Sequence, residues 1–139
     1  MTTKVLVWDI PTRVFHWLLA LSFLGAYLTG EEVSYRDLHL KFGYILLGLI
    51  GFRLIWGVIG SRYARFSAFW FKARAIMAYL QAMVHKNPEH YLGHNPAGSA
   101  AIFLLLGLGL LSSISGILLS LKWGGESLEG PHEVFANVM

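Results

Sequence analysis

The stretch WDIPTRVFHW, Trp8 to Trp17, opens the first long apolar run of the chain and decides how the rest is interpreted. It places a histidine, His16, about one turn inside that run. An ionisable side chain within a membrane span is costly and needs either a structural partner or a chemical role. Because Asp9 or Thr12 can cap the helix that follows, we expect a helix over about residues 14–29 that carries His16 near one end.

The composition is that of a membrane protein. Of the 139 residues, 55% are hydrophobic and only 14% are charged, against about 25% charged in a soluble domain. Residues 14–30 and 97–121 carry no charge, and residues 42–61 carry only Arg53. Since roughly 20 apolar residues cross a bilayer core, this pattern predicts three full spans in a multi-pass membrane protein.

Two more helices and one surface segment are expected after the first helix. In the segment 66–84, apolar residues fall on one face of the expected helix and Lys72 and Arg74 on the opposite face. This pattern is typical of an amphipathic helix on a membrane surface. An ordinary linker helix fits the same pattern. The two full helices are expected at about residues 39–60 and 97–121.

A fourth helix should begin at Pro131, because proline is tolerated in the first turn of a helix. The nine residues that remain reach only about 13 Å as a helix, well short of a bilayer core of roughly 30 Å. The predicted fold class is therefore all-α. It is one integral membrane domain, residues 1–139, forming an up-down four-helix bundle whose fourth helix is truncated after Met139. Either the chain is a fragment, or another chain completes the bundle.

The charges of the loops predict the orientation. Seven lysines and arginines lie in the lead-in and in the loop after the second helix, and three lie in the other two loops. The positive-inside rule then puts the N-terminus in the cytoplasm. The net charge of +3 is a loop effect and gives no reason to expect nucleic-acid binding. The absence of cysteine excludes disulfides, thiolate metal sites and covalent haem attachment through CxxCH.

Three histidines lie at the ends of apolar runs. On the predicted topology, His16 is near the cytoplasmic face, whereas His39 and His132 open their helices at the opposite face. Facing helices of a bundle can hold a cofactor through such side chains, and Gly43 would leave room for a flat ring one turn from His39. From the spacing alone, two interpretations remain open: interfacial polar residues, or axial ligands of a haem iron.

Two further polar residues have candidate roles. Arg53 could pair with a haem propionate, or its long side chain could snorkel to the interface. His94, in GHNPAG, could be a cap or loop residue, part of a quinone site, or a substitute ligand in place of His16. His85 and His90 belong to a polar loop and are expected to be solvated.

Five motifs in order resemble one known family. WDIPTRVFHW, LHLKFGY, RLIWGVIGSRYARF, GHNPAG and EGPHEVFANV are similar to the bacterial cytochrome b561 and nickel-iron hydrogenase b-type cytochrome family. The resemblance implies a four-helix protein of the bacterial inner membrane with two b haems. Such a protein carries electrons between the quinone pool and a partner such as a hydrogenase, a formate dehydrogenase or a c-type cytochrome.

The resemblance also implies the ligands. By the family pattern, His39 and His132 would hold the outer haem, and His16 would hold the inner haem together with a second histidine on the fourth helix. The sequence ends at Met139 before such a histidine, so the inner site is incomplete in this chain. Two other accounts are consistent with that departure. The protein could be degenerate and bind one haem or none, or His94 could fill in as the missing ligand.

The functional hypothesis is an electron-transfer subunit of an oxidoreductase, with quinone as a candidate substrate and membrane lipid as its surroundings. The bundle is also compatible with a homo-oligomer. The alternative is a haem-free membrane anchor or assembly subunit, which would keep the small-residue interfaces but would not need the histidines. A small transporter is disfavoured, because the spans lack the helix-breaking prolines and paired ionisable residues of a midplane substrate site.

Overall fold

The computed structural model describes residues 7–85, 87–123 and 125–139. Within these ranges the chain forms five α-helices, three short 3₁₀-helices and no strand, which confirms the all-α class. The α-helices are α1 (Ile10–Thr29), α2 (Arg36–Ile59), α3 (Ala73–Val84), α4 (Pro96–Ser120) and α5 (Glu129–Val138); the 3₁₀-helices are η1 (Val33–Tyr35), η2 (Phe66–Ala68) and η3 (Gly125–Leu128).

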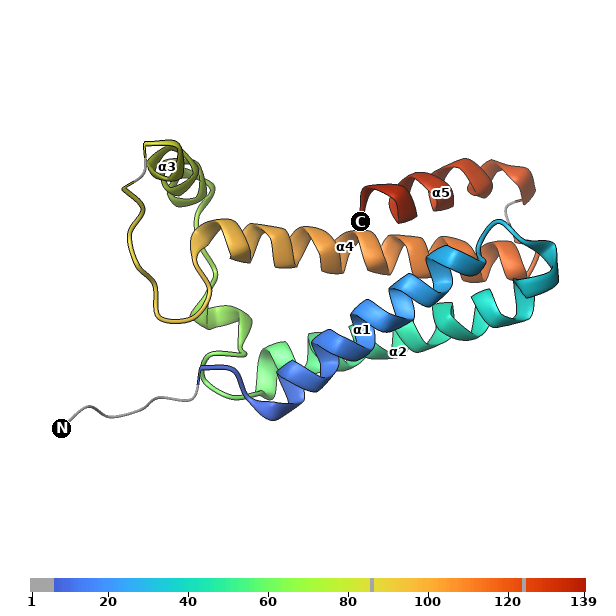
Figure 1. Ribbon diagram of the computed structural model, residues 1–139, viewed down its shortest axis with the longest axis horizontal. Coiled ribbons are helices and arrows are strands. Elements are labelled where there is room, and N and C mark those ends of the chain that lie inside the picture. The colour runs from blue at the N-terminus through green and yellow to red at the C-terminus, as the bar shows by residue number, and fades with distance from the viewer. Residues whose placement is uncertain (1–6, 86, 124) are drawn as a thin grey trace.

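The four helices α1, α2, α4 and α5 pack roughly along one long axis. Helices α1 and α2 lie antiparallel, α4 packs on α2, and α5 folds back along α4 (Figure 1). The end where α2 begins, α4 finishes and α5 starts is called the α5 end here. At the opposite end, the α3 end, α1 and α4 begin, and α3 lies across the bundle rather than along it (Figure 1).

Side-chain caps fix where two of the long helices begin. The Asp9 carboxylate accepts a hydrogen bond from the backbone N–H of Thr12 at 2.9 Å, and the Asn95 side chain accepts one from Gly98 at 2.7 Å. Such caps satisfy N–H groups that the first turn of a helix leaves unpaired. The cap at Asp9 starts α1 at Ile10, four residues before the expected boundary.

The other boundaries also differ from the expected ones. Helix α2 begins at Arg36 rather than at His39, because η1 leads directly into it. The segment 66–84 is not one helix: η2 comes first, and the α-helix covers only Ala73–Val84. Helix α5 begins at Glu129, which places Pro131 within its first turn.

Two helices in the described part of the chain are long and apolar enough to cross a membrane. They are Val33–Ile59, with mean hydropathy 1.9, and Pro96–Ser120, with mean hydropathy 2.4. Only 22% of either window is buried inside the chain, as expected for helices that face lipid. Of the three expected spans, two have the length and hydropathy of a membrane helix. Helix α1 does not, because its first turn contains Pro11, Thr12 and Arg13.

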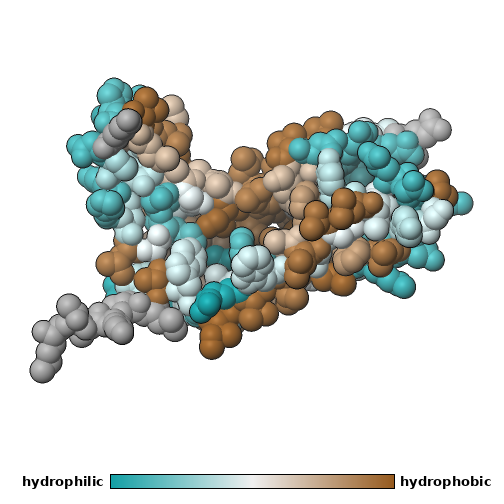
Figure 2. Space-filling view, viewed as in Figure 1, coloured by the Kyte–Doolittle hydropathy of each residue, from teal (hydrophilic) through white to brown (hydrophobic). Residues whose placement is uncertain are grey.

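The surface agrees with a membrane setting. Figure 2 shows hydrophobic side chains mostly over the middle of the elongated molecule and hydrophilic ones gathered at both ends. One cluster of buried apolar side chains joins α1, α2 and α4, with one residue from each: Phe15, Ile50 and Leu106. The helices therefore meet along a narrow seam that leaves both ends free to hold polar side chains.

Candidate functional site

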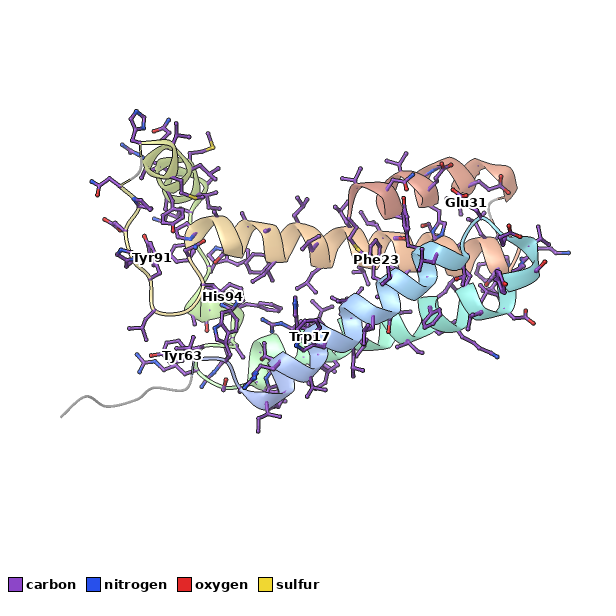
Figure 3. All side chains as sticks on the ribbon, in the orientation of Figure 1. Trp17, Phe23, Glu31, Tyr63, Tyr91 and His94 are labelled. Atoms are coloured by element: carbon purple, nitrogen blue, oxygen red, sulfur yellow. The ribbon has the colours of Figure 1, made fainter. Side chains whose placement is uncertain are left out.

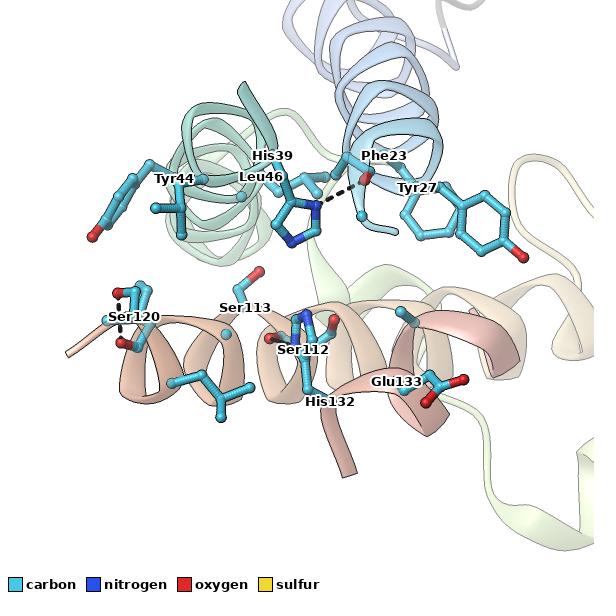
Figure 4. Close-up of a pocket in the computed structure, with 18 of the residues that line it drawn as sticks. Phe23, Tyr27, His39, Tyr44, Leu46, Ser112, Ser113, Ser120, His132 and Glu133 are labelled. Carbon is cyan, nitrogen blue, oxygen red and sulfur yellow. Dashed lines mark hydrogen bonds between the residues drawn. The ribbon is translucent and has the colours of Figure 1, made fainter. Parts of the chain in front are cut away.

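His39 and His132 lie next to each other at the α5 end. Their ring centres are 6.1 Å apart and their planes make an angle of 89°. Figure 4 shows the His39 ring pointing away from α2 toward α4 and α5, where His132 lies. Two imidazoles bound to one metal through bonds of roughly 2 Å would have their ring centres about 6 Å apart. The observed separation therefore suits a shared metal ion.

Hydrogen bonds fix which nitrogen of each ring is free. Nδ1 of His39 lies 2.8 Å from the carbonyl oxygen of Ala26 on α1, and Nδ1 of His132 lies 2.9 Å from that of Ser112 on α4. A carbonyl oxygen can only accept, so each Nδ1 carries the proton and donates it. The lone pair of each ring is then on Nε2, the arrangement found when a neighbouring acceptor orients a metal-ligating histidine.

A cavity of about 790 Å³ surrounds the two rings. This volume falls within the range of roughly 300–1,000 Å³ that is usual for cofactor and ligand sites. Four glycines from the end of α1, from α2 and from α4 form part of its wall: Gly30, Gly43, Gly109 and Gly116.

Two of these glycines show what the wall accommodates. A Cβ atom added at Gly116 would lie 2.8 Å from Cε1 of His132, so only glycine lets that ring approach α4. A Cβ atom at Gly43 would meet nothing within 4 Å, because that position faces open space in the cavity. Glycine at these two positions thus lets His132 pack close to α4 and leaves open space on α2 where a planar ring could lie.

Sequence reasoning missed three parts of this site. The carbonyl oxygens of Ala26 and Ser112 orient the histidines, and the Ser115 hydroxyl lies 3.2 Å from Nδ1 of His132. Arg36 is the one lysine or arginine among the described residues that line the cavity. Small residues on the third span gave a partial signal for the serines, but no sequence pattern marks a carbonyl contact between helices.

His16 occupies a different part of the molecule. It lies near the start of α1 with its side chain exposed, and its ring contacts that of Trp17, 5.9 Å away. No other histidine ring contacts it within the described ranges, and no cluster of three or more metal-binding side chains occurs there. The structure thus brings His39 and His132 together but gives His16 no second ligand.

Arg53 is buried in the protein. Its side chain is only 3% exposed, its Nη1 atom has no hydrogen-bond partner, and its Cζ atom lies 4.8 Å from the ring centre of Phe66. Protein side chains therefore cover the guanidinium, and whether it lies at the membrane interface stays a prediction. Fourteen residues of helix, about 21 Å, separate Arg53 from His39, so the guanidinium cannot serve the cavity at the α5 end.

His94 lies beside Arg53 at the α3 end. Its ring packs against Trp8 and Phe69, with centres 4.5 and 4.3 Å away, and its Nδ1 atom has no hydrogen-bond partner. Burial, assisted by the positive charge of Arg53, lowers the pKa of His94, so the imidazole is neutral at pH 7. Figure 3 shows His94 at the same end as Tyr63, with Glu31 at the opposite end.

An all-helical chain with two membrane-length helices and a pair of facing imidazoles has the architecture of membrane cytochromes of the b class. Residues 7–139 match the family described as prokaryotic cytochrome b561. The chain belongs to this family, which confirms the resemblance of its five motifs. Family membership implies a membrane location and haem b as the cofactor.

Three related proteins agree with this assignment. A probable Ni/Fe-hydrogenase B-type cytochrome subunit of Azotobacter vinelandii is 31% identical over 144 residues, covering 84% of this chain and 60% of that protein. The subunit of the same name from Azotobacter chroococcum mcd 1 is 31% identical over 151 residues, covering 89% and 62%. A probable Ni/Fe-hydrogenase 1 B-type cytochrome subunit of Escherichia coli K12 is 24% identical over 143 residues, covering 81% and 59%.

The chain spans about 60% of the length of these curated relatives. No solved structure matches the chain.

Proposed function

We propose that this chain carries electrons through the membrane, with a b haem held between His39 and His132. The observation that supports this proposal best is the pair of rings 6.1 Å apart, each with Nδ1 donating to a carbonyl oxygen and Nε2 free. The cavity volume and the glycine wall fit the same cofactor.

Each part of the site would have a separate task. The Nε2 atoms of His39 and His132 would ligate the iron, and Gly43 and Gly116 would leave room beside the ring. The Arg36 guanidinium, which lines the cavity, would offset the charge of a propionate. The haem supplies the one-electron chemistry, while ligand identity, burial and the hydrogen bonds to the ligands set its potential.

The family pattern extends the proposal to the whole bundle. The bundle would be of the up-down four-helix type, in the bacterial inner membrane with the N-terminus in the cytoplasm and with α1 as a third span. His16, exposed on α1, would then be a ligand of a second, inner haem whose other ligand lies outside the described residues. The redox partner, by analogy with the names of the relatives, would be a nickel-iron hydrogenase.

The α3 end supports exchange of electrons with a quinone. Arg53 and His94 offer two buried nitrogen atoms without hydrogen-bond partners, and Phe66 and Phe69 wall them with aromatic rings. A quinone presents carbonyl oxygens that accept hydrogen bonds and a flat ring that packs against aromatics. We therefore place the quinone at these two residues.

The quinone site can be tested through His94. His94→Ala should slow the reduction of the haem by quinol, while dithionite should still reduce the same amount of haem. His90→Ala, which changes an exposed loop histidine, is the control. Unchanged reduction by quinol in His94→Ala would exclude this location. Arg53→Gln distinguishes a role of Arg53 in quinone binding from a role in binding a haem propionate. Loss of a propionate partner would lower the haem content itself, whereas loss of a quinone contact would slow only the reduction by quinol.

The electron-transfer function can be tested in proteoliposomes. Quinol in the membrane should reduce ferricyanide outside the vesicles through the wild-type chain, and His39→Ala should stop this current. His85→Ala should not, because that ring is exposed and hydrogen-bonded only to the Gln81 carbonyl oxygen. A haem-free anchor would give no current with any of the three proteins.

A further inference from the structure

Helix α3 lies across the helices that are long enough to span a membrane, not along them (Figure 1). Figure 1 shows α3 nearly end-on, whereas α2 and α4 run along the long axis of the molecule. If α2 and α4 cross a bilayer, α3 must lie parallel to the membrane surface, at the level where α4 begins.

The side chains of α3 divide into three faces. Half-buried residues, Ala75, Tyr79 and Ala82, lie on the side packed against the protein. The helical spacing i, i+3, i+7 then brings Met77, Leu80 and Val84 together as an apolar stripe. These three side chains are 58%, 42% and 80% exposed, so the described chain leaves much of the stripe uncovered.

The third face of α3 is polar and lies about a quarter turn around the helix from the stripe. Arg74, Ala78 and Gln81 are exposed there, and Ala78 lies almost opposite Leu80 around the helix. In Figure 2 the region around α3 is hydrophilic on its outer side and hydrophobic on the side toward the middle of the molecule. Such a helix can rest on a membrane with its stripe inward and its polar face in water.

The charge around α3 is strongly positive. Four exposed basic side chains gather at this end, and none of them forms an ion pair within the described residues: Arg62, Arg65, Lys72 and Arg74. The basic side chains outnumber the nearby carboxylates, which are the buried Asp9, bonded to Thr12 and Trp56, and the exposed Glu89, bonded to Tyr91. Trp70, 72% exposed, adds an aromatic side chain of the kind found at membrane interfaces.

We propose that the α3 end binds the headgroups of anionic phospholipids. The stripe Met77, Leu80 and Val84 enters the boundary between headgroups and acyl chains, and the four basic side chains pair with lipid phosphates. Electrostatic attraction to an anionic leaflet strengthens binding by roughly fivefold for each lysine or arginine near the surface. This surface is separate from the cavity at the α5 end, so the inference does not depend on haem binding.

Spin labels can measure how deeply each face of α3 lies in the membrane. Because the sequence has no cysteine, Leu80→Cys and Ala78→Cys each give one labelling site in the full-length chain. Both variants are reconstituted into nanodiscs of phosphatidylcholine, with and without phosphatidylglycerol. We expect the Leu80→Cys label to be reached by oxygen and shielded from a water-soluble relaxing agent, more so with phosphatidylglycerol. The Ala78→Cys label should remain accessible to the aqueous agent.

Equal aqueous access at the two positions, or no dependence on phosphatidylglycerol, would overturn the proposal. Shielding of Leu80→Cys only at high protein-to-nanodisc ratios would also overturn it, since a second copy would then cover the stripe. Circular dichroism checks that each variant is folded. If Leu80→Cys does not fold, Val84→Cys provides a label on the same stripe.

The charges can be tested by competition between two lipids. In mixed nanodiscs, energy transfer from Trp70 to labelled phosphatidylglycerol, in a background where the other tryptophans are phenylalanine, measures how much of that lipid is enriched beside α3. The double variant Lys72→Gln with Arg74→Gln should lower the enrichment by roughly fivefold per charge. The control Lys41→Gln removes an exposed charge at the α5 end and should change nothing. Equal enrichment in the double variant and the wild type would contradict the proposal.

Discussion

At the scale of single residues, Gly116 controls how closely His132 can approach α4. A methyl group there would come within 2.8 Å of Cε1 and 3.3 Å of Nδ1 of the ring. The ring would have to move, and its hydrogen bond to the Ser112 carbonyl oxygen would lengthen or break. That bond orients the free Nε2 atom. One added methyl group at Gly116 would therefore also displace the ligating nitrogen.

Gly116→Ala should therefore lower the amount of haem bound per chain and shift the absorption band of what remains. The matched control is Gly107→Ala on the same helix, where an added Cβ atom meets nothing within 4 Å. We expect the control to retain its haem, because alanine is also the better helix former by about 1 kcal/mol. The pyridine haemochrome assay measures both. Equal haem contents in the two variants would mean that His132 is not held as the structure places it.

Sequence analysis predicted single site residues where a residue type was unusual for its position. His39 and His132 stood out because histidine is unusual at the start of an apolar helix, and the structure brings them together. The acceptors on Ala26 and Ser112 did not, since every residue has a carbonyl group and only the packing decides which ones meet a ring. The surroundings of Arg53 were not predictable, because the sequence does not show that Phe66 packs against its guanidinium.

At the scale of secondary structure elements, Asp9 joins the beginning of α1 to the end of α2. One carboxylate oxygen caps α1 through Thr12, and the other accepts a hydrogen bond from Nε1 of Trp56 at 3.0 Å. Burial alone would raise the pKa of Asp9, but the hydrogen bonds from Ser61, Thr12 and Trp56 outweigh it and lower the pKa to about 2. The carboxylate is therefore ionised in the folded chain at any ordinary pH.

Asp9→Asn should destabilise the folded chain in detergent by about 2 kcal/mol at pH 7, the free energy that corresponds to this shift in pKa. The pKa is depressed in the folded state, so the stabilisation is fully present above the ordinary value of 3.8 and is lost as the pH falls toward 2. Thermal unfolding followed by circular dichroism should show the difference between variant and wild type narrowing over that interval.

The matched control for this prediction is Asp37→Asn, an exposed acidic residue in the first turn of α2 with no capping bond. Its effect should be small and should not follow the pH in the same way. A difference between Asp9→Asn and the wild type that stays constant from pH 7 to pH 2 would show that the carboxylate is not held by these bonds.

The helices were predicted well in their interiors and poorly at their ends. Long apolar runs predicted α2 and α4, with Arg53 as the one charge in the run 42–61 and none in 97–121, because burial in lipid requires a long apolar stretch. The beginning of α1 at Ile10 depends on the cap at Asp9, and sequence analysis proposed that cap without deciding between Asp9 and Thr12. The segment 66–84 contains a 3₁₀-turn before α3, which its amphipathic composition does not reveal.

At the scale of the whole molecule, the distribution of charge predicts how the bundle sits in a membrane. The α3 end holds most of the lysines and arginines, so it should face the cytoplasm. Ser67→Cys in η2 and Ser34→Cys in η1 place single exposed thiols at opposite ends of the chain, which has no cysteine of its own.

In intact cells, a membrane-impermeant maleimide should label Ser34→Cys and leave Ser67→Cys unlabelled until the inner membrane is permeabilised. Labelling of Ser67→Cys alone would reverse the proposed orientation. Labelling of both thiols before permeabilisation would mean that the two ends lie on the same side, which an up-down bundle does not allow.

The all-helical class was predictable because the membrane restricts what a chain of this composition can form. The pairing of α5 with α4 is less constrained by sequence, since it rests on small residues such as Gly109 and Gly116 that occur in many membrane helices. The surroundings of His16 were not predictable, since only the packing shows that its ring is exposed and contacts Trp17.

The most direct test of the central claim is the reduced-minus-oxidised spectrum of the purified full-length chain, with a haem count, in four proteins. We predict b haem in the wild type and in His85→Ala, and loss of at least one haem per chain in both His39→Ala and His132→Ala. Circular dichroism would confirm that all four are folded. A folded His39→Ala or His132→Ala variant with the haem content and spectrum of the wild type would contradict the account.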